Sequence, residues 1–369
     1  MLFRSGRYQS LARIGNSQYV FGNTTVPTTY STSLANTALS WETTKVINGG
    51  VDFGILNGRL RGSVDIYSSE TYDLLLQRSI PETSGFASVF TNLGQVHNHG
   101  VEIALNSTNS NPANPNWSWE SGFTFSLNRN RIEALTGIDA DNDGIEDDDI
   151  SNSWFIGYPV DVYYGYQVDG IYQIGDEIPD GFQAGEYRLK DTDGVEGLTA
   201  DDRTILGSSL PNYTFSISNT LRFKNFSLYV LINSIQGGGK YNYYMGDNIR
   251  MYNVNGRFST WSERFNFQDV PYWTPNNPSN EYPIINYVPS RGHPVLEDRS
   301  FVRLQDVSLS YNFDQDLLSR LGLQSLRLYV SGKNLHTWTK WSGYDPENAT
   351  TVGNFPMLRT FTLGADLRF

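Results

Sequence analysis

The last ten residues of the chain, TFTLGADLRF, alternate between apolar and polar side chains and finish on an aromatic ring. Because successive side chains of a β-strand point to opposite faces, this segment predicts a strand with one apolar face. We expect lipid to cover that face, with the terminal ring in an interfacial band of aromatic residues. The apolar face consists of Phe361, Leu363, Ala365, Leu367 and Phe369.

The same alternation recurs in nine segments along the chain. Each marks the apolar positions of a predicted strand of roughly ten residues or more, the length that crosses a bilayer when the strand is tilted. The sequence therefore predicts an all-β chain of antiparallel strands. The segments are 47–55, 60–66, 101–105, 117–127, 215–223, 226–232, 307–313, 326–330 and 361–369.

The links between these strands alternate in length. The short links are 57–58, 106–116, 224–225 and 314–324, and the long links are about 77–95, 129–211, 237–299 and 337–356. Outer-membrane barrels have short periplasmic turns and long extracellular loops, whereas a soluble sandwich has no reason to sort its loops by end. The pattern favours a transmembrane β-barrel segment over a soluble all-β domain, and it places the hairpin signal Asn57-Gly58 on the periplasmic side.

Composition excludes several other classes of protein. Mean hydropathy is −0.42 and no apolar run approaches the roughly 18 residues of a membrane helix. A net charge of −12 argues against nucleic acid as a partner, since phosphate contacts need Lys and Arg. The chain has no cysteine, which excludes disulfides and thiol catalysis. The N-terminal stretch MLFRSGRYQS has no signal-peptide pattern.

Seven longer stretches carry more than a strand pattern. They are SWETTKVINGGVDFGILNGRLRGSVDIY (40–67), SGFASVFTNLGQVHNHGVEIAL (84–105), SWFIGYPVDVYYGYQVDGIYQ (153–173), DDRTILGSSLPNYTFSISNTLRFKNFSL (201–228), RSFVRLQDVSLSYNF (299–313), LYVSGKNLHTWTKWSGYDPE (328–347) and FPMLRTFTLGADLRF (355–369). Together they resemble, in order, the C-terminal part of SusC/RagA-like TonB-linked outer-membrane proteins of Bacteroidota. The resemblance covers nearly everything from about residue 36 onward.

The resemblance implies an outer-membrane importer of glycans or peptides, energised by the TonB complex. It implies a SusD-like lipoprotein as partner and a plugged barrel of about 22 strands, of which this chain supplies roughly nine. Residues 41–369 are then the C-terminal barrel segment, and residues 1–40 the remnant of a preceding strand or extracellular loop. The plug region, through which TonB would act, is expected upstream.

Two acidic segments follow the spacing of a calcium loop, where carboxylates at positions 1, 3 and 5, glycine at 6 and a carbonyl at 7 surround the ion. The alternative is a pair of solvated acidic loops. In the first, position 12 is Ile150 instead of an acid; in the weaker second, position 5 is Val195. The candidate ligands are Asp139, Asp141, Asp143, Ile145 and Asp147 in the first segment, and Asp191, Asp193, Gly197, Thr199 and Asp202 in the second.

Aromatic residues crowd two of the predicted extracellular loops. Such rings stack on sugars or pack against a protein partner, or they pack among themselves within the loop. We predict substrate or partner contacts at Tyr241, Tyr243, Tyr244, Tyr252, Trp261, Tyr272, Trp273, Trp338, Trp341 and Tyr344.

No catalytic motif is present. The chain lacks G-x-S-x-G, H-E-x-x-H and an acid pair placed for glycosidase chemistry, so we expect no enzyme. The main alternative to an importer is an outer-membrane barrel or adhesin that binds sugars without energy coupling. A secreted β-rich hydrolase would be a soluble protein with an acid pair in a cleft.

Overall fold

The computed structural model describes residues 10–80, 82–110, 114, 116–241, 271–284, 296–320, 322–343, 345–347 and 357–369. Among these residues, no helix is long and apolar enough to cross a membrane. The chain divides into two compact units. The first comprises Met1–Gly50, Asp65–Val101 and Asn128–Val160, and the second comprises Val51–Val64, Glu102–Leu127 and Asp161–Phe369.

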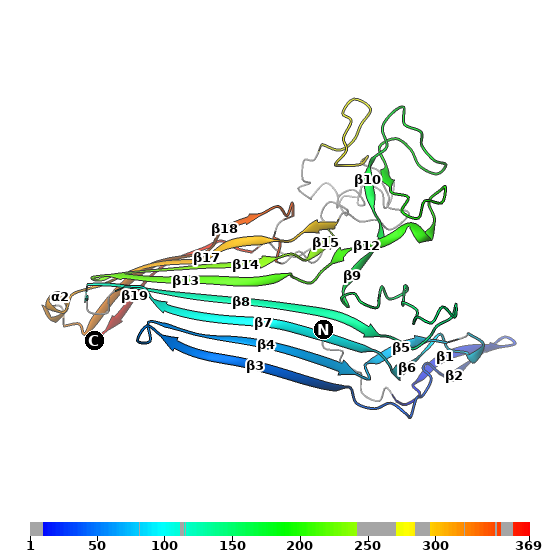
Figure 1. Cartoon of the computed structure of the whole chain (residues 1–369), viewed down its shortest axis with the longest axis horizontal. Helices are drawn as coiled ribbons and strands as arrows, with labels where there is room; N and C mark the ends of the chain where they lie inside the picture. The colour runs from blue at the N-terminus through cyan, green and yellow to red at the C-terminus, as the bar shows by residue number, and fades with distance from the viewer. Residues whose placement is uncertain are drawn as a thin grey trace. The chain divides into compact units, whose positions relative to one another are not determined.

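Nine long strands match the nine predicted segments. They are β3 (Thr43–Ile55), β4 (Leu60–Tyr72), β7 (Gln95–Thr108), β8 (Trp117–Ala134), β13 (Tyr213–Phe223), β14 (Phe226–Gln236), β17 (Phe301–Asn312), β18 (Ser325–Thr339) and β19 (Thr360–Arg368). They form one sheet in the order β19-β18-β17-β14-β13-β8-β7-β4-β3, so each strand lies beside its neighbour in the predicted series (Figure 1). Most of them extend past the last apolar residue, because backbone pairing continues where the side chains no longer alternate.

One face of the sheet between β8 and β19 is apolar in register. A row of paired residues crosses six strands, and the side chains that it places on the outer strands are exposed: Leu309 by 42%, Val330 by 47% and Leu363 by 84%. Such exposure of aligned apolar side chains is typical of a surface that meets lipid. The complete row is Trp119, Leu221, Leu228, Leu309, Val330 and Leu363.

A parallel row, two residues nearer the short turns, is mostly aromatic. Its members pair directly across the strands, with 6.4 Å between the ring centroids of Trp117 and Phe223 and 4.7 Å between those of Phe226 and Tyr311. Aromatic girdles of this kind mark the interface of a barrel with the membrane surface. The complete row is Trp117, Phe223, Phe226, Tyr311, Leu328 and Ala365.

The opposite face of the same strands is polar. One row on it consists of Glu120, Thr220, Tyr229, Ser308, Ser331 and Thr362. The Tyr329 ring lies against Gly364 on β19, so a larger residue at 364 would displace the ring. An apolar outer face and a polar inner face are the two sides of an outer-membrane barrel wall.

The four short links lie at one end of the sheet, as the alternation of link lengths predicts, although only 224–225 has the predicted bounds. Between β13 and β14 the turn is the two residues Lys224 and Asn225, with Lys224 at φ 51°. The predicted two-residue turn at Asn57-Gly58 is wrong in length, because the link between β3 and β4 covers residues 56–59. Its residues Leu56, Asn57 and Gly58 all have positive φ, so the left-handed turn starts one residue earlier than the Asn-Gly signal indicates.

The long loops contain small elements that the alternation did not reveal. Residues 10–40 include the hairpin β1–β2, inside the segment predicted as the remnant of a preceding strand or loop. The helix α2 occupies a short link. These elements are β1 (Ile14–Phe21), β2 (Thr24–Ser31), β5 (Leu75–Ser79), η1 (Glu82–Ser84), β6 (Ser88–Asn92), β9 (Val162–Tyr166), β10 (Val168–Ile171), β11 (Tyr187–Leu189), η2 (Ala200–Asp202), β12 (Arg203–Ser208), β15 (Gly239–Tyr241), β16 (Leu296–Asp298) and α2 (Gln315–Arg320).

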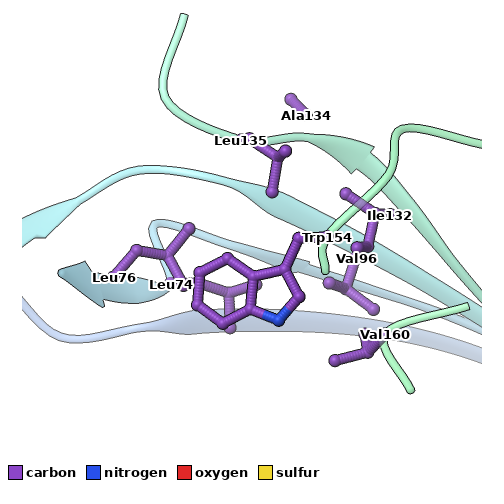
Figure 2. A pocket seen from close by; sticks show the side chains of 8 residues that line it. All are labelled: Leu74, Leu76, Val96, Ile132, Ala134, Leu135, Trp154 and Val160. Carbon is purple, nitrogen blue, oxygen red and sulfur yellow. The ribbon is translucent and has the colours of Figure 1, made fainter. Parts of the chain in front are cut away.

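Each unit has its own buried apolar cluster. In the first unit, Leu74, Leu76, Ile132 and Leu135 are buried, with Trp154 packed against them (Figure 2). The cavity among these side chains is about 20 Å³, too small for a nutrient. In the second unit, a separate cluster under the loops consists of Ile171, Tyr187, Leu189 and Trp273.

Candidate functional site

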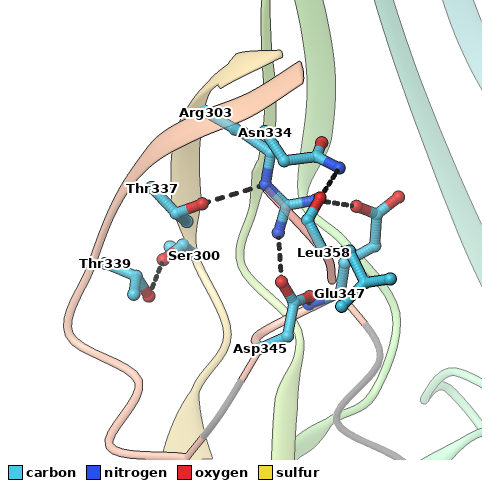
Figure 3. Close-up of polar contacts among 8 residues, drawn as sticks. All are labelled: Ser300, Arg303, Asn334, Thr337, Thr339, Asp345, Glu347 and Leu358. Carbon is cyan, nitrogen blue, oxygen red and sulfur yellow. Dashed lines mark hydrogen bonds and ion pairs between the residues drawn. The ribbon is translucent and has the colours of Figure 1, made fainter. Parts of the chain in front are cut away.

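A buried arginine holds the start of the last long loop to the sheet. Arg303 on β17 is fully buried and forks to two acids, with 2.7 Å from Nη2 to Asp345 Oδ2 and 2.5 Å from Nη1 to Glu347 Oε2 (Figure 3). Its Nε donates to Thr337 Oγ1 at 2.9 Å, and its guanidinium lies 4.7 Å from the Phe301 ring centroid. Each of the three guanidinium nitrogens of Arg303 therefore has a hydrogen-bond acceptor.

These residues were not among the sites predicted from the sequence. The signal was present, since Arg303 interrupts an alternating stretch and Asp345 and Glu347 follow the end of β18. All three lie in stretches that carried the family resemblance. The ion pair between Arg303 and Asp345 therefore connects the stretches 299–313 and 328–347, with 42 residues between its two members.

The first acidic loop brings three of its predicted ligands together. Carboxylate oxygens of Asp139, Asp141 and Asp147 lie within 4.8 Å of one another. The backbone NH of Asp143 donates to Asp139 and Asp141 at 3.2 and 3.1 Å, and that of Gly144 donates to Asp139 at 3.0 Å. The Asp143 carboxylate accepts from the NH of Ile145 at 2.7 Å and is not one of the three clustered carboxylates.

The second acidic loop also gathers three carboxylates, those of Asp191, Asp193 and Asp202. Asp202 is fully buried and accepts backbone hydrogen bonds from Thr199 and Thr192, both at 2.7 Å. The backbone hydrogen bond from Thr199, followed by that from Thr192, holds the pKa of Asp202 below its ordinary value. Its carboxylate is therefore ionised at neutral pH, and the stabilisation it gives the loop is lost only as the pH falls through that lowered pKa. Gly197, the predicted carbonyl ligand, lies on the exposed part of the loop.

The predicted aromatic contacts divide into buried and exposed rings. Trp273 and Trp341 are buried, and the indole NH of Trp273 donates to Gln173 Oε1 at 2.8 Å. Tyr272 and Trp338 are exposed, and Trp338 pairs with Val302 on the apolar face of the sheet. For Tyr241 the structure describes only the backbone. The other five predicted contacts lie outside the described residues: Tyr243, Tyr244, Tyr252, Trp261 and Tyr344.

A family model for the β-barrel of TonB-dependent receptor-like proteins matches residues 3–335. The chain belongs to the TonB-dependent receptor family. A TonB-dependent receptor of Formosa agariphila is 32% identical over 98% of this chain and 38% of its own length. The TonB-dependent receptor SusC of Bacteroides thetaiotaomicron is 26% identical over 96% of this chain and 34% of its own length.

Solved structures give the same result. The RagAB peptide importer in its open-open state matches with a TM-score of 0.76 and 26% identity, over 99% of this chain and 38% of that one. The chain thus spans about two fifths of the length of the receptors it matches. These families are outer-membrane proteins, as the strand pattern predicts. They are receptors and transporters, which agrees with the prediction of a non-enzyme.

We propose that both acidic loops bind calcium, since each gathers three carboxylates at the spacing of a calcium loop. Replacing Asp139 and Asp141 by asparagine should weaken binding at the first loop by at least about tenfold, because affinity follows the number of charged ligands. Terbium luminescence of the complete protein, with calcium as competitor, measures this. The matched control is Asp316→Asn on α2, at the short-turn end, which should change nothing. Equal terbium binding in the unmodified protein, the double variant and the control would contradict calcium binding at the first loop.

Proposed function

We propose that this chain forms the C-terminal barrel wall of a nutrient importer that takes up glycans or peptides across the outer membrane. Uptake is energised by TonB through a plug region, and a SusD-like lipoprotein covers the extracellular mouth. The observation that carries the proposal is the two-sided sheet of a TonB-dependent receptor, with an apolar outer row and a polar inner row in register across six strands.

Similarity to known proteins supports a SusD-like partner and a glycan or peptide substrate. SusC and the RagAB peptide importer both match nearly the whole chain. The polar inner face, rich in Ser and Thr, suits a wall along which polar nutrients and a plug move without a large desolvation cost. Long loops at one end provide the surface that a lipoprotein would cover.

The test is energy-dependent accumulation. A strain that produces the complete protein is given pools of oligosaccharides and of peptides, and the compounds inside the cells are measured by mass spectrometry. We expect one pool to accumulate, and we expect most of that accumulation to be lost when TonB is deleted or a protonophore is added, while binding at the cell surface persists.

Two outcomes would contradict this proposal. Accumulation that is independent of TonB would indicate a passive pore. Surface binding with no accumulation in the TonB-positive strain would favour the alternative, an outer-membrane binding protein without energy coupling. A strain without the protein is the control for uptake by other routes.

A further inference from the structure

An open pocket of about 450 Å³ lies among the loops of the second unit. It is formed by the loop that joins β10 to β11 and by the segment that follows β11. Its volume is in the range of small-molecule sites, roughly 300–1,000 Å³. Apolar side chains that line it are Tyr172, Phe182, Leu189 and Leu198.

The pocket is built on a packed base. Tyr172 and Leu189 are buried, and the rings of Tyr172 and Phe182 lie 5.5 Å apart between centroids. Phe182 and Leu198 pack against the buried cluster that contains Trp273. Gly185, at φ 90°, lies so close to the Trp273 ring that a side chain would clash, which fixes the loop. The pocket is therefore largely formed before any ligand binds.

The rim of the pocket is acidic. Glu177, Asp180 and Asp191 line it and are exposed, against a single basic residue, Arg188. Arg188 is already engaged with Asp169, donating from Nη2 to its carbonyl oxygen at 2.7 Å with 3.5 Å between Nε and Oδ2. Glu177 and Asp180 make no hydrogen bond or ion pair with any other residue that the structure describes. The negative charges of these two carboxylates can therefore interact with a bound ligand.

We propose that this pocket binds a lysine or arginine side chain of a peptide. The aliphatic stem of such a side chain packs on the apolar floor, its cation lies against the half-buried ring of Phe182, and the carboxylates of Glu177 and Asp180 supply the counter-charge. An acidic peptide or acidic glycan is repelled by the same carboxylates and by the net charge of −12 on the chain. The proposal rests on the proposed import function and narrows its substrate class to peptides with a basic residue.

The test compares fluorescent peptides on the complete protein in detergent, by polarisation. The peptides share one sequence and differ at a single central position, which is Lys, Gln or Glu. We expect the Lys peptide to bind at least about tenfold more tightly than the Gln peptide, because both the cation–π contacts and the carboxylates recognise the charge. The Glu peptide should bind most weakly, and added salt should reduce the preference.

Variants assign the binding to this pocket. Glu177→Gln with Asp180→Asn, and separately Phe182→Ala, should each remove most of the preference for the Lys peptide. The matched control is Asp201→Asn, an exposed acid in η2 that does not line the pocket. Calcium is kept constant, because Asp191 belongs both to the rim and to the second acidic loop.

Equal binding of the Lys and Gln peptides, or a preference that survives both variants, would overturn the inference. Binding of a neutral oligosaccharide that is lost in Phe182→Ala would also overturn it, by assigning the pocket to sugars, and would leave the import function intact. A failure of TonB-dependent accumulation beside intact Lys-peptide binding would count against the import function alone.

Discussion

Replacing Arg303 by methionine should destabilise the protein by about 3–5 kcal/mol, the cost of leaving the buried carboxylate of Asp345 without its cation. Asp345 is buried with Arg303, and the network is the link between β17 and the segment after β18. Denaturation of the complete protein in detergent measures the loss. Hydrogen exchange should show early opening of residues 340–343 and 345–347, while the strand β14 stays protected.

Two further variants separate the charge from the packing. Adding Asp345→Leu and Glu347→Met to Arg303→Met should recover most of the stability, since a well-packed apolar replacement of a buried ion network is often neutral. Arg327→Met is the control, because its pair with Asp366 is 3.9 Å long and half-exposed, and should cost under about 1 kcal/mol. Equal losses for Arg303→Met and Arg327→Met would contradict the role of the network.

A charge on the outer face of the sheet should be nearly as costly. Val307 on β17 pairs with Val230 and Gly332. Along the strand it lies between Tyr311, in the aromatic row, and Val302, which pairs with Trp338. Arginine there lies near the middle of the bilayer and should cost about 2–4 kcal/mol. Folding of the complete protein into lipid vesicles, followed by its heat-modifiable mobility in gels, measures the effect.

The matched control is the next residue along the strand. Ser308 pairs with Tyr229 and Ser331 on the polar face, so Ser308→Arg places the same side chain on the same strand toward water. We expect it to fold almost as the unmodified protein does. If Ser308→Arg is the more damaging of the two substitutions, the assignment of the faces is reversed.

The sheet could be predicted from the sequence because its signals are local. A period of two residues identified all nine strands, and turn residues such as Lys224-Asn225 marked where they reverse. The ends of the strands were less accurate, since β8 and β18 continue where neither face is consistently apolar. The spacing of the acidic loops is equally local, and in each loop three carboxylates do lie together.

Contacts between distant residues were the part that the sequence could not predict. The partners of Arg303 lie 42 and 44 residues away, and no spacing rule joins an arginine to acids at that separation. The burial of Trp273 likewise depends on distant residues, those of β10 and β11. Its indole NH donates a hydrogen bond to Gln173, which is 100 residues earlier in the chain. An aromatic residue in a loop therefore could not be assigned to core or to binding without the fold.

The aromatic residues at the short-turn end also record the angle at which the strands cross the membrane. Trp117 on β8 shares a row with Ala365 on β19, yet the terminal ring of Phe369 lies four residues further along the chain. Suppose that the rings of Trp117 and Phe369 lie at the same depth in the membrane. The four residues between Ala365 and Phe369 then correspond to about 14 Å along the strand, and the six strands from β8 to β19 span about 24 Å across the sheet. The strands then lean by roughly 30°, close to the 35–45° of known outer-membrane barrels. Phe313, two residues past Tyr311 and directly after the intervening β17, lies close to the same oblique line.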